Sequence, residues 1–353
     1  MTQHASRDLD APFDPGTLHS DTLPALLQRL GVSVALTSFQ ANRLMLVRSE
    51  GATVDVLFRE VPRPMGLVIE PQQMLLGSWA QVLEYRRHDA LNASVEPGCP
   101  VDASYVPHAT RVTGDINIHD IARGHDGTLW MVNTAFSCLA TLDPAYHFVP
   151  RWKPDFISTL AHEDRCHLNG MAMRDGRPAF VTAFSRDDTP LGWKSYRNEG
   201  LLMSVPDGKV LAEGLSFPHS PRWIDGWLYY CESGHGRVWR CREDGSEPTL
   251  VAELPGYTRG LAHLGSLLFV GLSRVRFSEN APPMPLVERH PTTTSGFWVI
   301  DLEKLDEQGW LIFTGDIDQI YDLALIEQAC FPHVMAWSDE DFGHRFHFPP
   351  LTA

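Results

Sequence analysis

Four short polar segments recur along the middle of the chain, and their side chains are of types that bind metals or anions. They begin at His119, Asn169, His219 and Arg259, so they are 50, 50 and 40 residues apart. Imidazole nitrogens coordinate zinc, iron and copper, and a guanidinium group binds carboxylates or phosphates. If the four segments occupy equivalent structural positions, these side chains converge on one site.

A third imidazole belongs to this set. His167 lies two residues before Asn169, as Asn117 does before His119, and side chains at i and i+2 share one side of a strand. His119, His167, His219 and Asn169 are therefore the predicted ligands of a divalent transition metal (zinc, iron or copper). Three imidazoles with an open position are typical of a catalytic metal. The alternative is that each histidine caps a strand and hydrogen-bonds a neighbouring turn.

Arg259 is predicted to bind an anionic group of the substrate, because its guanidinium stays protonated and presents a fork of donors. The competing role is an ion pair with Asp120 or Asp322.

Other polar residues complete the predicted site. Asn133 and Tyr321 are candidates for substrate binding, together with Arg259. Asp115 and Glu163 are candidate proton acceptors or additional metal ligands, so the predicted catalytic group is Arg259, Asp115 and Glu163.

Several neighbouring residues are assigned structural roles. We expect Arg222 to pack between elements and Asp164 to form a local salt bridge with Arg165. Cys166 beside His167 suggests a nucleophile and its base, but adjacent residues of a strand point to opposite faces, which disfavours that pair.

The elements that hold the polar segments are predicted to be strands. In the three clearest copies, the polar segment opens a β run and an Asp-Gly turn leads into a second run. Asp-Gly suits a two-residue hairpin because both residues tolerate positive φ. A period of 40 to 50 residues with short strands is typical of propeller blades, whose innermost strands line one axis. The turns are at Asp126-Gly127, Asp175-Gly176 and Asp225-Gly226.

Two further inner strands are predicted at Met65 and Tyr321, which makes six. Too few residues follow Cys330 to complete the last blade, whereas the β runs of residues 34–58 precede the first inner strand. We therefore predict an all-β fold, a six-bladed β-propeller with four-stranded blades, closed by its N-terminal strands.

The segments outside the ring are predicted as follows. Residues 1–31 form a lead and a short helix, capped by Ser20 and closed by Gly31. Residues 32–331 form the propeller, and within them the Pro-rich residues 278–294 form a long loop at the pocket mouth. Residues 332–353 form an aromatic tail that either packs on the outside or joins two subunits of a homo-oligomer.

Composition excludes several classes of function. The formal charge is −15 without clusters of Lys and Arg, which opposes nucleic-acid and anionic-membrane partners. The first residues lack the apolar core of a secretory signal, and no apolar stretch is long enough to span a bilayer, so a cytoplasmic location is predicted. The six cysteines are scattered without a CxxC pair, which predicts reduced, mostly buried thiols.

Two resemblances accompany these motifs. The blade plan and the Asn169-Gly170 step resemble the gluconolactonase, senescence-marker and strictosidine-synthase propellers, in which an Asn-Gly supplies a metal ligand. That group binds its cation mainly through acidic and amide oxygens, whereas imidazoles here favour a transition metal over calcium. Longer motifs are similar to an uncharacterised bacterial family, and they cover residues 129–143, 163–170, 218–223 and 256–261.

We therefore expect a metal-dependent enzyme that acts on a small, anionic substrate in the central funnel, as a lactone or ester hydrolase or as a lyase. Two alternatives stay open. One is a non-enzymatic propeller that binds a ligand or protein and has structural histidines. The other is an oxygenase or oxidase with a histidine-ligated redox metal.

Overall fold

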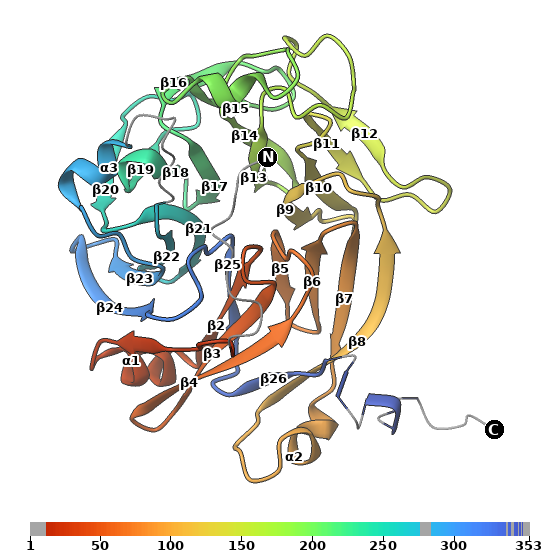
Figure 1. The fold of residues 1–353 in the computed structure, drawn as a ribbon, viewed down its shortest axis with the longest axis vertical. Coiled ribbons are helices and arrows are strands. Elements are labelled where there is room, and N and C mark those ends of the chain that lie inside the picture. Colours follow the sequence, from red (N-terminus) through yellow and green to blue (C-terminus); the bar gives the residue numbers. More distant parts are fainter. Residues whose placement is uncertain are drawn as a thin grey trace.

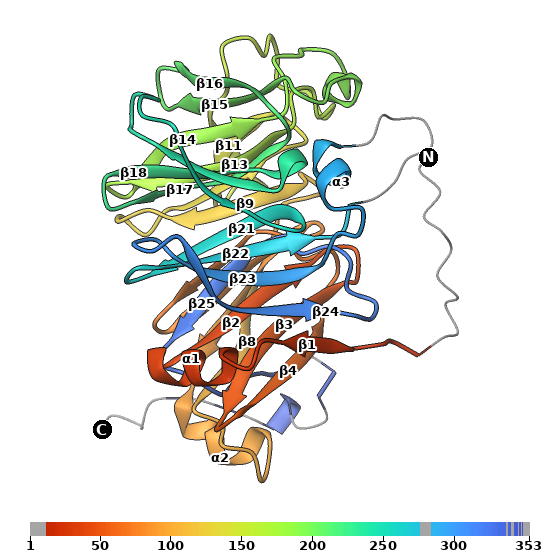
Figure 2. The same cartoon turned by 90° about the vertical axis from the view of Figure 1, so that its left-hand side faces the viewer.

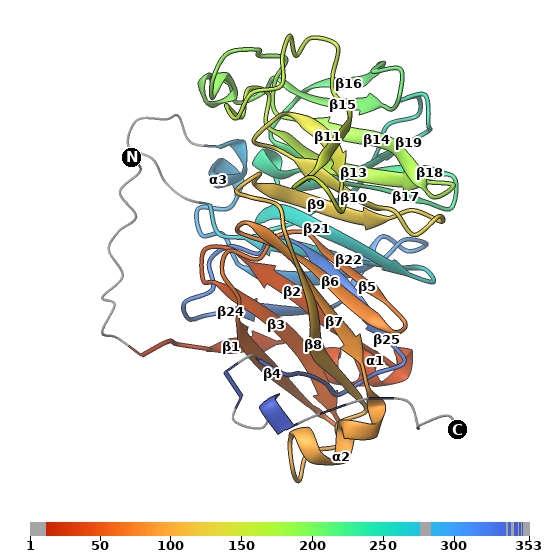
Figure 3. The same ribbon diagram turned by 90° about the vertical axis from the view of Figure 1, so that its right-hand side faces the viewer.

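The computed structural model describes residues 12–275 and 284–336, together with residues 338, 339, 342–344, 346 and 348. These residues form six sheets arranged as blades around one axis, which confirms the predicted six-bladed β-propeller (Figure 1). The side views show the strands running across the thickness of the ring (Figure 2, Figure 3). In the described part of the chain, no helix is long and apolar enough to cross a membrane.

Blades 1 to 3 follow one another along the chain, and each runs from an inner strand at the axis to an outer strand at the rim. Blade 1 consists of β5 (Leu67–Glu70), β6 (Gln73–Ser78), β7 (Gln81–Arg87) and β8 (Ala103–Val112). Blade 2 consists of β9 (Ile118–Arg123), β10 (Leu129–Asn133), β11 (Cys138–Thr141) and β12 (Val149–Trp152). Blade 3 consists of β13 (Leu168–Arg174), β14 (Arg177–Ala183), β15 (Gly200–Ser204) and β16 (Val210–Leu215).

Blades 4 and 5 repeat this order, and blade 6 combines both ends of the chain. Blade 4 consists of β17 (Pro218–Ile224), β18 (Trp227–Glu232), β19 (Arg237–Cys241) and β20 (Thr249–Glu253). Blade 5 consists of β21 (Tyr257–Leu264), β22 (Leu267–Ser273), β23 (Gly296–Asp301) and β24 (Asp306–Phe313). Blade 6 consists of β25 (Leu323–Glu327), β2 (Val32–Ser38), β3 (Arg43–Glu50) and β4 (Thr53–Glu60).

The ring closes in blade 6 as predicted. The C-terminal inner strand β25 pairs with the N-terminal strand β2, from Val32 opposite Glu327 to Leu36 opposite Leu323. Terminal segments also extend two outer edges: β1 (Thr17–His19) pairs with β24, and β26 (Pro332–Val334) pairs in parallel with β8. The propeller thus uses residues on both sides of the expected range 32–331.

The core is divided among the interfaces between blades. Six hydrophobic clusters are found among the described residues, and each joins two neighbouring blades. Middle strands are covered on both faces, and for this reason β2 is buried at every position. The outer strand β4 is covered less, and its two ends are exposed.

Two of the three predicted Asp-Gly hairpins are confirmed. Asp175-Gly176 has φ values of 52° and 72°, and Asp225-Gly226 has 47° and 80°. The two-residue turn predicted at Asp126-Gly127 is wrong, because β9 and β10 are joined by residues 124–128 and only Gly127 of that pair has positive φ. Asp126 instead accepts a hydrogen bond from the Thr128 amide at 2.9 Å.

The predicted N-terminal helix is present as α1 (Leu23–Leu30), but Ser20 does not cap it. Thr22 occupies the N-cap without a side-chain cap bond, whereas the Ser20 hydroxyl accepts from the Trp310 amide at 3.1 Å and so ties the segment to β24. Gly31 closes the helix at φ 65°, as predicted. The buried helix residues join the core between blades 5 and 6, and they are Leu23, Leu26 and Leu27.

Short helical segments occupy several connections. The Pro-rich stretch predicted as an inter-strand loop connects β22 to β23, and its described part contains the unpredicted short helix α3 (Pro285–Arg289); residues 278–283 lie outside the described residues. Of the predicted tail, Trp337 and His347 also lie outside them, as do residues 1–11 of the lead. The remaining segments are α2 (Asn92–Val95), η1 (Asp89–Leu91), η2 (Gly192–Ser195), η3 (Ser233–His235) and η4 (Phe342–His344).

All six cysteines are free thiols. Four are buried in the blades, whereas Cys99 is exposed and Cys330 is half-buried. The predicted reduced state therefore agrees with the structure.

Candidate functional site

Five of the predicted residues, from five blades, meet at the axis of the ring. The His119 ring lies 4.7 Å from the His167 ring and 5.3 Å from the Tyr321 ring, centroid to centroid. The guanidinium carbon of Arg259 lies 4.2 Å from the Tyr321 centroid, and Nη2 of Arg259 donates to Nε2 of His219 at 2.9 Å. All five are at most 8% exposed.

Phe184, which follows β14, closes this set into a circle. Its ring lies 5.1 Å from His219 and 4.5 Å from His167. We call these six side chains the axial ring: His119, His167, Phe184, His219, Arg259 and Tyr321. Sequence reasoning missed Phe184, because an aromatic residue after a strand gives no chemical signal.

The backbone fixes the orientation of two imidazoles in the same way. Asn117 and Phe217 have φ values of 54° and 51°, and each places its carbonyl 2.9 Å from Nδ1 of the histidine two residues later. A carbonyl oxygen can only accept, so Nδ1 of His119 and of His219 carries the proton. Nε2 is therefore the unprotonated nitrogen of both rings.

His167 is oriented by a carboxylate instead. Its Nδ1 lies 3.0 Å and 2.9 Å from the two oxygens of Asp164, which also accepts from the Trp193 indole at 3.0 Å. The predicted Asp164–Arg165 salt bridge is absent from the described contacts, and Arg165 pairs with Glu163 and Asp188. The sequence signal that could have identified the pair of Asp164 and His167 is an acidic residue three positions before a histidine.

Burial keeps two of the imidazoles neutral. It lowers the pKa of His119 well below its usual value, and the nearby His167 adds to the effect. Burial, and next the charge of Arg259, lowers the pKa of His219 in the same way. Burial also raises the pKa of Tyr321, so its phenol stays protonated and can donate a hydrogen bond.

A buried ion network accompanies the axial ring. Arg222 of β17 lies 3.0 Å from Asp120 and 3.5 Å from Asp322, so these carboxylates pair with Arg222 and not with Arg259. Burial raises the pKa of Asp322 to about 7, although Arg222 acts in the opposite direction. Arg222, which the sequence suggested to pack between blades, thus joins blades through ion pairs.

Glycines let the inner strands approach closely at the axis. A Cβ at Gly170 would lie 2.5 Å from Pro221, and a Cβ at Gly260 would lie 2.8 Å from the Leu323 amide. Both neighbours belong to the inner strand of the next blade. The Asn-Gly step thus has a packing role that is independent of any metal.

Four members of the axial ring, His119, His219, Arg259 and Tyr321, line a cavity of about 10 Å³. Its other lining residues are Asn169, Gly170, Ser220 and the ion network of Arg222, Asp120 and Asp322. The cavity has room for roughly one water molecule. A substrate does not fit beside Arg259 while the ring stays closed.

A larger pocket adjoins the axial ring, and we call it the mouth pocket. It measures about 370 Å³, within the roughly 300–1,000 Å³ usual for ligand sites. Asn117 and Asp164, which orient His119 and His167, both line it. Its lining is completed by Arg63, Asp115, Ala135, His162, Glu163, Pro190 and Leu191.

The mouth pocket brings together the two predicted carboxylates. Asp115 lies 3.8 Å from Arg63 and accepts from the Trp79 indole at 3.2 Å, and its carbonyl is 2.7 Å from Nε2 of His162. Glu163 pairs with Arg165 at 2.8 Å. Sequence reasoning missed Arg63 and His162, which enter from loops whose position depends on the closed ring.

Asn133 lies elsewhere. It is fully buried, its Oδ1 accepts from the Phe136 amide at 3.1 Å, and it lines neither the axial cavity nor the mouth pocket. Cys166 is also fully buried, and burial raises the pKa of its thiol to about 12, which disfavours a nucleophilic thiolate.

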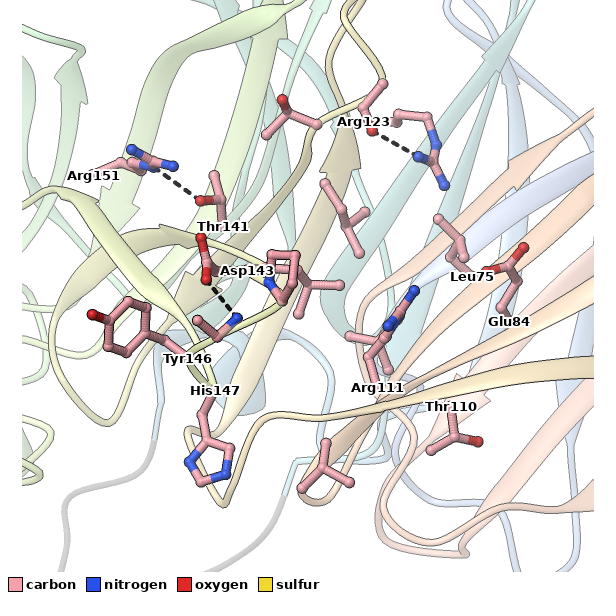
Figure 4. A pocket seen from close by; sticks show the side chains of 18 residues that line it. Leu75, Glu84, Thr110, Arg111, Arg123, Thr141, Asp143, Tyr146, His147 and Arg151 are labelled. Atoms are coloured by element: carbon pink, nitrogen blue, oxygen red, sulfur yellow. Dashed lines mark hydrogen bonds between the residues drawn. The ribbon is translucent and has the colours of Figure 1, made fainter.

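Another groove lies away from the axis, between blades 1 and 2 (Figure 4). It measures about 800 Å³, and several of its polar groups already have protein partners. Arg151 donates to Thr141 at 2.9 Å, and Arg123 donates to the Gly127 carbonyl at 2.8 Å. The mouth pocket, which is lined by the residues that orient His119 and His167, is therefore the stronger candidate for chemistry.

The fit to the predicted metal is incomplete. Among the residues that the structure describes, no group of three or more His, Cys, Asp or Glu side chains is placed to hold a metal ion. Both nitrogens of His219 are engaged, Nδ1 by Phe217 and Ser233 and Nε2 by Arg259. Nε2 of His119 and of His167 has no hydrogen-bond partner among the described residues.

Comparisons with known proteins agree on the fold. Residues 21–335 match the family described as "Domain of unknown function (DUF4915)". No curated protein matches the sequence. A chain of the solved structure "Crystal structure of Nidogen/Laminin Complex" is similar with a TM-score of 0.53 and 13% identity, over 85% of this chain and 100% of that chain. At this identity the similarity concerns the fold alone.

Proposed function

The chain belongs to the DUF4915 family, and we propose that it is an acid–base enzyme that acts on a small, uncharged substrate in the mouth pocket. Esters and lactones are the substrates that suit it best. His167 is the general base in this proposal, and Asp164, which orients it, lines the mouth pocket. His167 itself is buried and is not among the lining residues, so the proposal requires the reacting water to reach it past Asp164.

The observation that carries the proposal is the contact between Asp164 and His167. A carboxylate on Nδ1 fixes the tautomer, leaves Nε2 able to take a proton, and stabilises the imidazolium that forms. Both residues are held at positive φ, 46° for Asp164 and 51° for His167. Such strain costs on the order of 1–3 kcal/mol per residue and is found at functional sites more than elsewhere.

The charges of the mouth pocket support an uncharged substrate. Asp115, Glu163 and Asp164 face one pocket arginine, Arg63, so an anionic substrate would meet repulsion there. Arg259, which suggested an anionic substrate from the sequence, lies in the axial cavity and does not line the mouth pocket.

The residues then act as follows in hydrolysis. Nε2 of His167 takes a proton from water as the water oxygen attacks the substrate carbonyl. The imidazolium returns that proton to the leaving oxygen as the carbon–oxygen bond breaks. Asp115 and Glu163 orient the substrate through its hydroxyl groups.

The test is hydrolysis of a panel of neutral esters and lactones by wild-type protein and His167→Gln. We expect turnover that His167→Gln reduces by roughly 10²–10⁴-fold, the usual contribution of a general base. His263→Gln is the matched control, because His263 is a partly exposed residue of β21 in blade 5, which contributes no residue to the mouth pocket. Equal rates for all three proteins would contradict the proposal.

A second candidate is the metal enzyme suggested by the sequence. The observation in its favour is that His119, His167 and His219 all donate through Nδ1, as metal-ligating histidines commonly do. They would hold a divalent transition metal that supplies Lewis-acid or redox chemistry, provided that Arg259 moves away from His219.

Elemental analysis of protein purified without a His tag separates the candidates. One bound zinc, iron or copper per chain, lost in His119→Ala, would support the metal enzyme. Less than about one tenth of an equivalent together with ester turnover would support the metal-free mechanism. The absence of both metal and turnover would leave a non-enzymatic binding propeller.

A further inference from the structure

Three buried polar atoms on residues that line the axial cavity have no hydrogen-bond partner among the described residues. They are Nε of Arg259, the hydroxyl of Tyr321 and Nδ2 of Asn169, and all three residues line the cavity. A buried donor left unpaired costs roughly 1–3 kcal/mol. Nε of Arg259 and Nδ2 of Asn169 can only donate and the Tyr321 hydroxyl can donate, so one acceptor in the cavity would serve all three.

Arg259 also lacks a counter-charge. It is 8% exposed, and no carboxylate among the described residues pairs with it. Two carboxylates, Asp120 and Asp322, also line the cavity, but both are bound to Arg222, which lines it too. The other close contacts of Arg259 are the neutral His219 and the Tyr321 ring. Burial of an unpaired guanidinium is unfavourable, and an anion in the cavity would compensate it.

The size of the cavity limits the anion. At about 10 Å³ it holds roughly one water-sized particle, and it shares no lining residue with the mouth pocket. A halide ion is larger than water but is a single atom, whereas a carboxylate or phosphate would have to open the ring. A water molecule could satisfy the hydrogen bonds of the three groups, but it would leave the charge of Arg259 uncompensated.

We propose that the axial cavity is a binding site for a halide-sized inorganic anion, physiologically chloride, held by Arg259, Tyr321 and Asn169. These residues belong to blades 5, 6 and 3, so the anion ties blades together across the axis. It also neutralises the charge beside His219. This site is separate from the mouth pocket and does not depend on the proposed acid–base chemistry.

Crystals grown with sodium bromide test the site directly through anomalous scattering. We expect one bromide peak in the axial cavity within hydrogen-bond distance of Arg259 and Tyr321. A peak elsewhere only, or water alone in the cavity, would overturn the proposal.

Unfolding in solution tests the affinity. At constant ionic strength, replacement of gluconate by chloride should raise the unfolding midpoint with saturation, as expected for a ligand that binds only the folded state. Tyr321→Phe removes one hydrogen bond to the anion and should raise the half-saturating chloride concentration about tenfold. Tyr257→Phe is the matched control, because Tyr257 neighbours Arg259 but does not line the cavity.

Three outcomes would overturn the proposal. The first is no chloride dependence in the wild type. The second is equal chloride dependence in Tyr321→Phe and the wild type. The third is an equal response to formate, which would assign the site to a carboxylate. The chain's formal charge of −15 opposes unspecific anion uptake, so a saturable response is diagnostic.

Discussion

Replacement of Asp164 by Asn removes the charge that stabilises protonated His167 while keeping the size of the side chain. Asp164 offers oxygens to Nδ1 of His167 at 2.9 and 3.0 Å and to the Trp193 indole at 3.0 Å. An amide has one oxygen for these two donors. Nδ1 of His167 therefore either loses its acceptor or faces the amide NH2 group, which favours the other tautomer.

The magnitude follows from the burial of the pair. The side chains of His167 and Asp164 are 9% and 16% exposed, which places them in a partly desolvated environment. Two unit charges at about 4 Å then attract by about 4 kcal/mol, compared with about 1 kcal/mol in water. Since about 1.36 kcal/mol corresponds to a tenfold change in rate, Asp164→Asn should lower kcat/KM by roughly 10³-fold.

The assay is the initial rate on an ester or lactone that the wild type hydrolyses. Asp188→Asn is the matched control, because Asp188 is also a paired carboxylate but binds Arg165 and Ser158. We expect Asp188→Asn to stay within a few-fold of the wild type. Wild-type kcat/KM in a correctly folded Asp164→Asn protein would refute the role of the pair.

Three further predictions concern stability. Gly176→Ala should lower the free energy of unfolding in urea more than Gly127→Ala does. Both glycines have positive φ, so strain costs each variant about 1–2 kcal/mol, but only at Gly176 would a Cβ also meet a neighbour, at 2.4 Å. Equal losses would contradict this. Arg48→Met should lower the free energy of unfolding by about 3–5 kcal/mol, because Arg48 is 2% exposed and binds Glu96 at 2.8 Å. Arg43→Met should lower it by at most about 1 kcal/mol, because the carboxylate partner of Arg43 is exposed. The lowered pKa of His119 means that the unfolded chain takes up a proton on acidification before the folded chain does. The stability advantage of wild type over His119→Phe should therefore be largest above about pH 6.5 and shrink as the pH falls below it, and an advantage that grows with acid would contradict the assignment.

The architecture could be predicted from the sequence because each blade repeats a local pattern. The polar segment, the turn and the second β run recur at His119, Asn169 and His219, so the inner strands were identifiable one by one. Closure of the ring followed from counting strands at both ends. The added edge strands β1 and β26 carry no repeat signal, and their pairing depends on edges that exist only in the folded ring.

The candidate site could be predicted only in part. Residue type and period identified the imidazoles and Arg259, whose convergence the structure shows. The division into two cavities was not predictable, because it depends on positive φ at Asn117 and His167, which interrupts strand alternation. Asn117 therefore faces the mouth pocket while His119 faces the axis, although the two residues were expected on one side.

The most direct test of the account is the tautomer of the axial histidines, measured by nitrogen-15 NMR at neutral pH. The proposed base and the alternative metal site both require Nε2 of His167 to carry a lone pair, and the contact with Asp164 assigns the proton to Nδ1. The account predicts a proton on Nδ1 and none on Nε2 for His119, His167 and His219. A proton on Nε2 of His167 would contradict it, because that nitrogen could then neither accept a proton nor bind a metal.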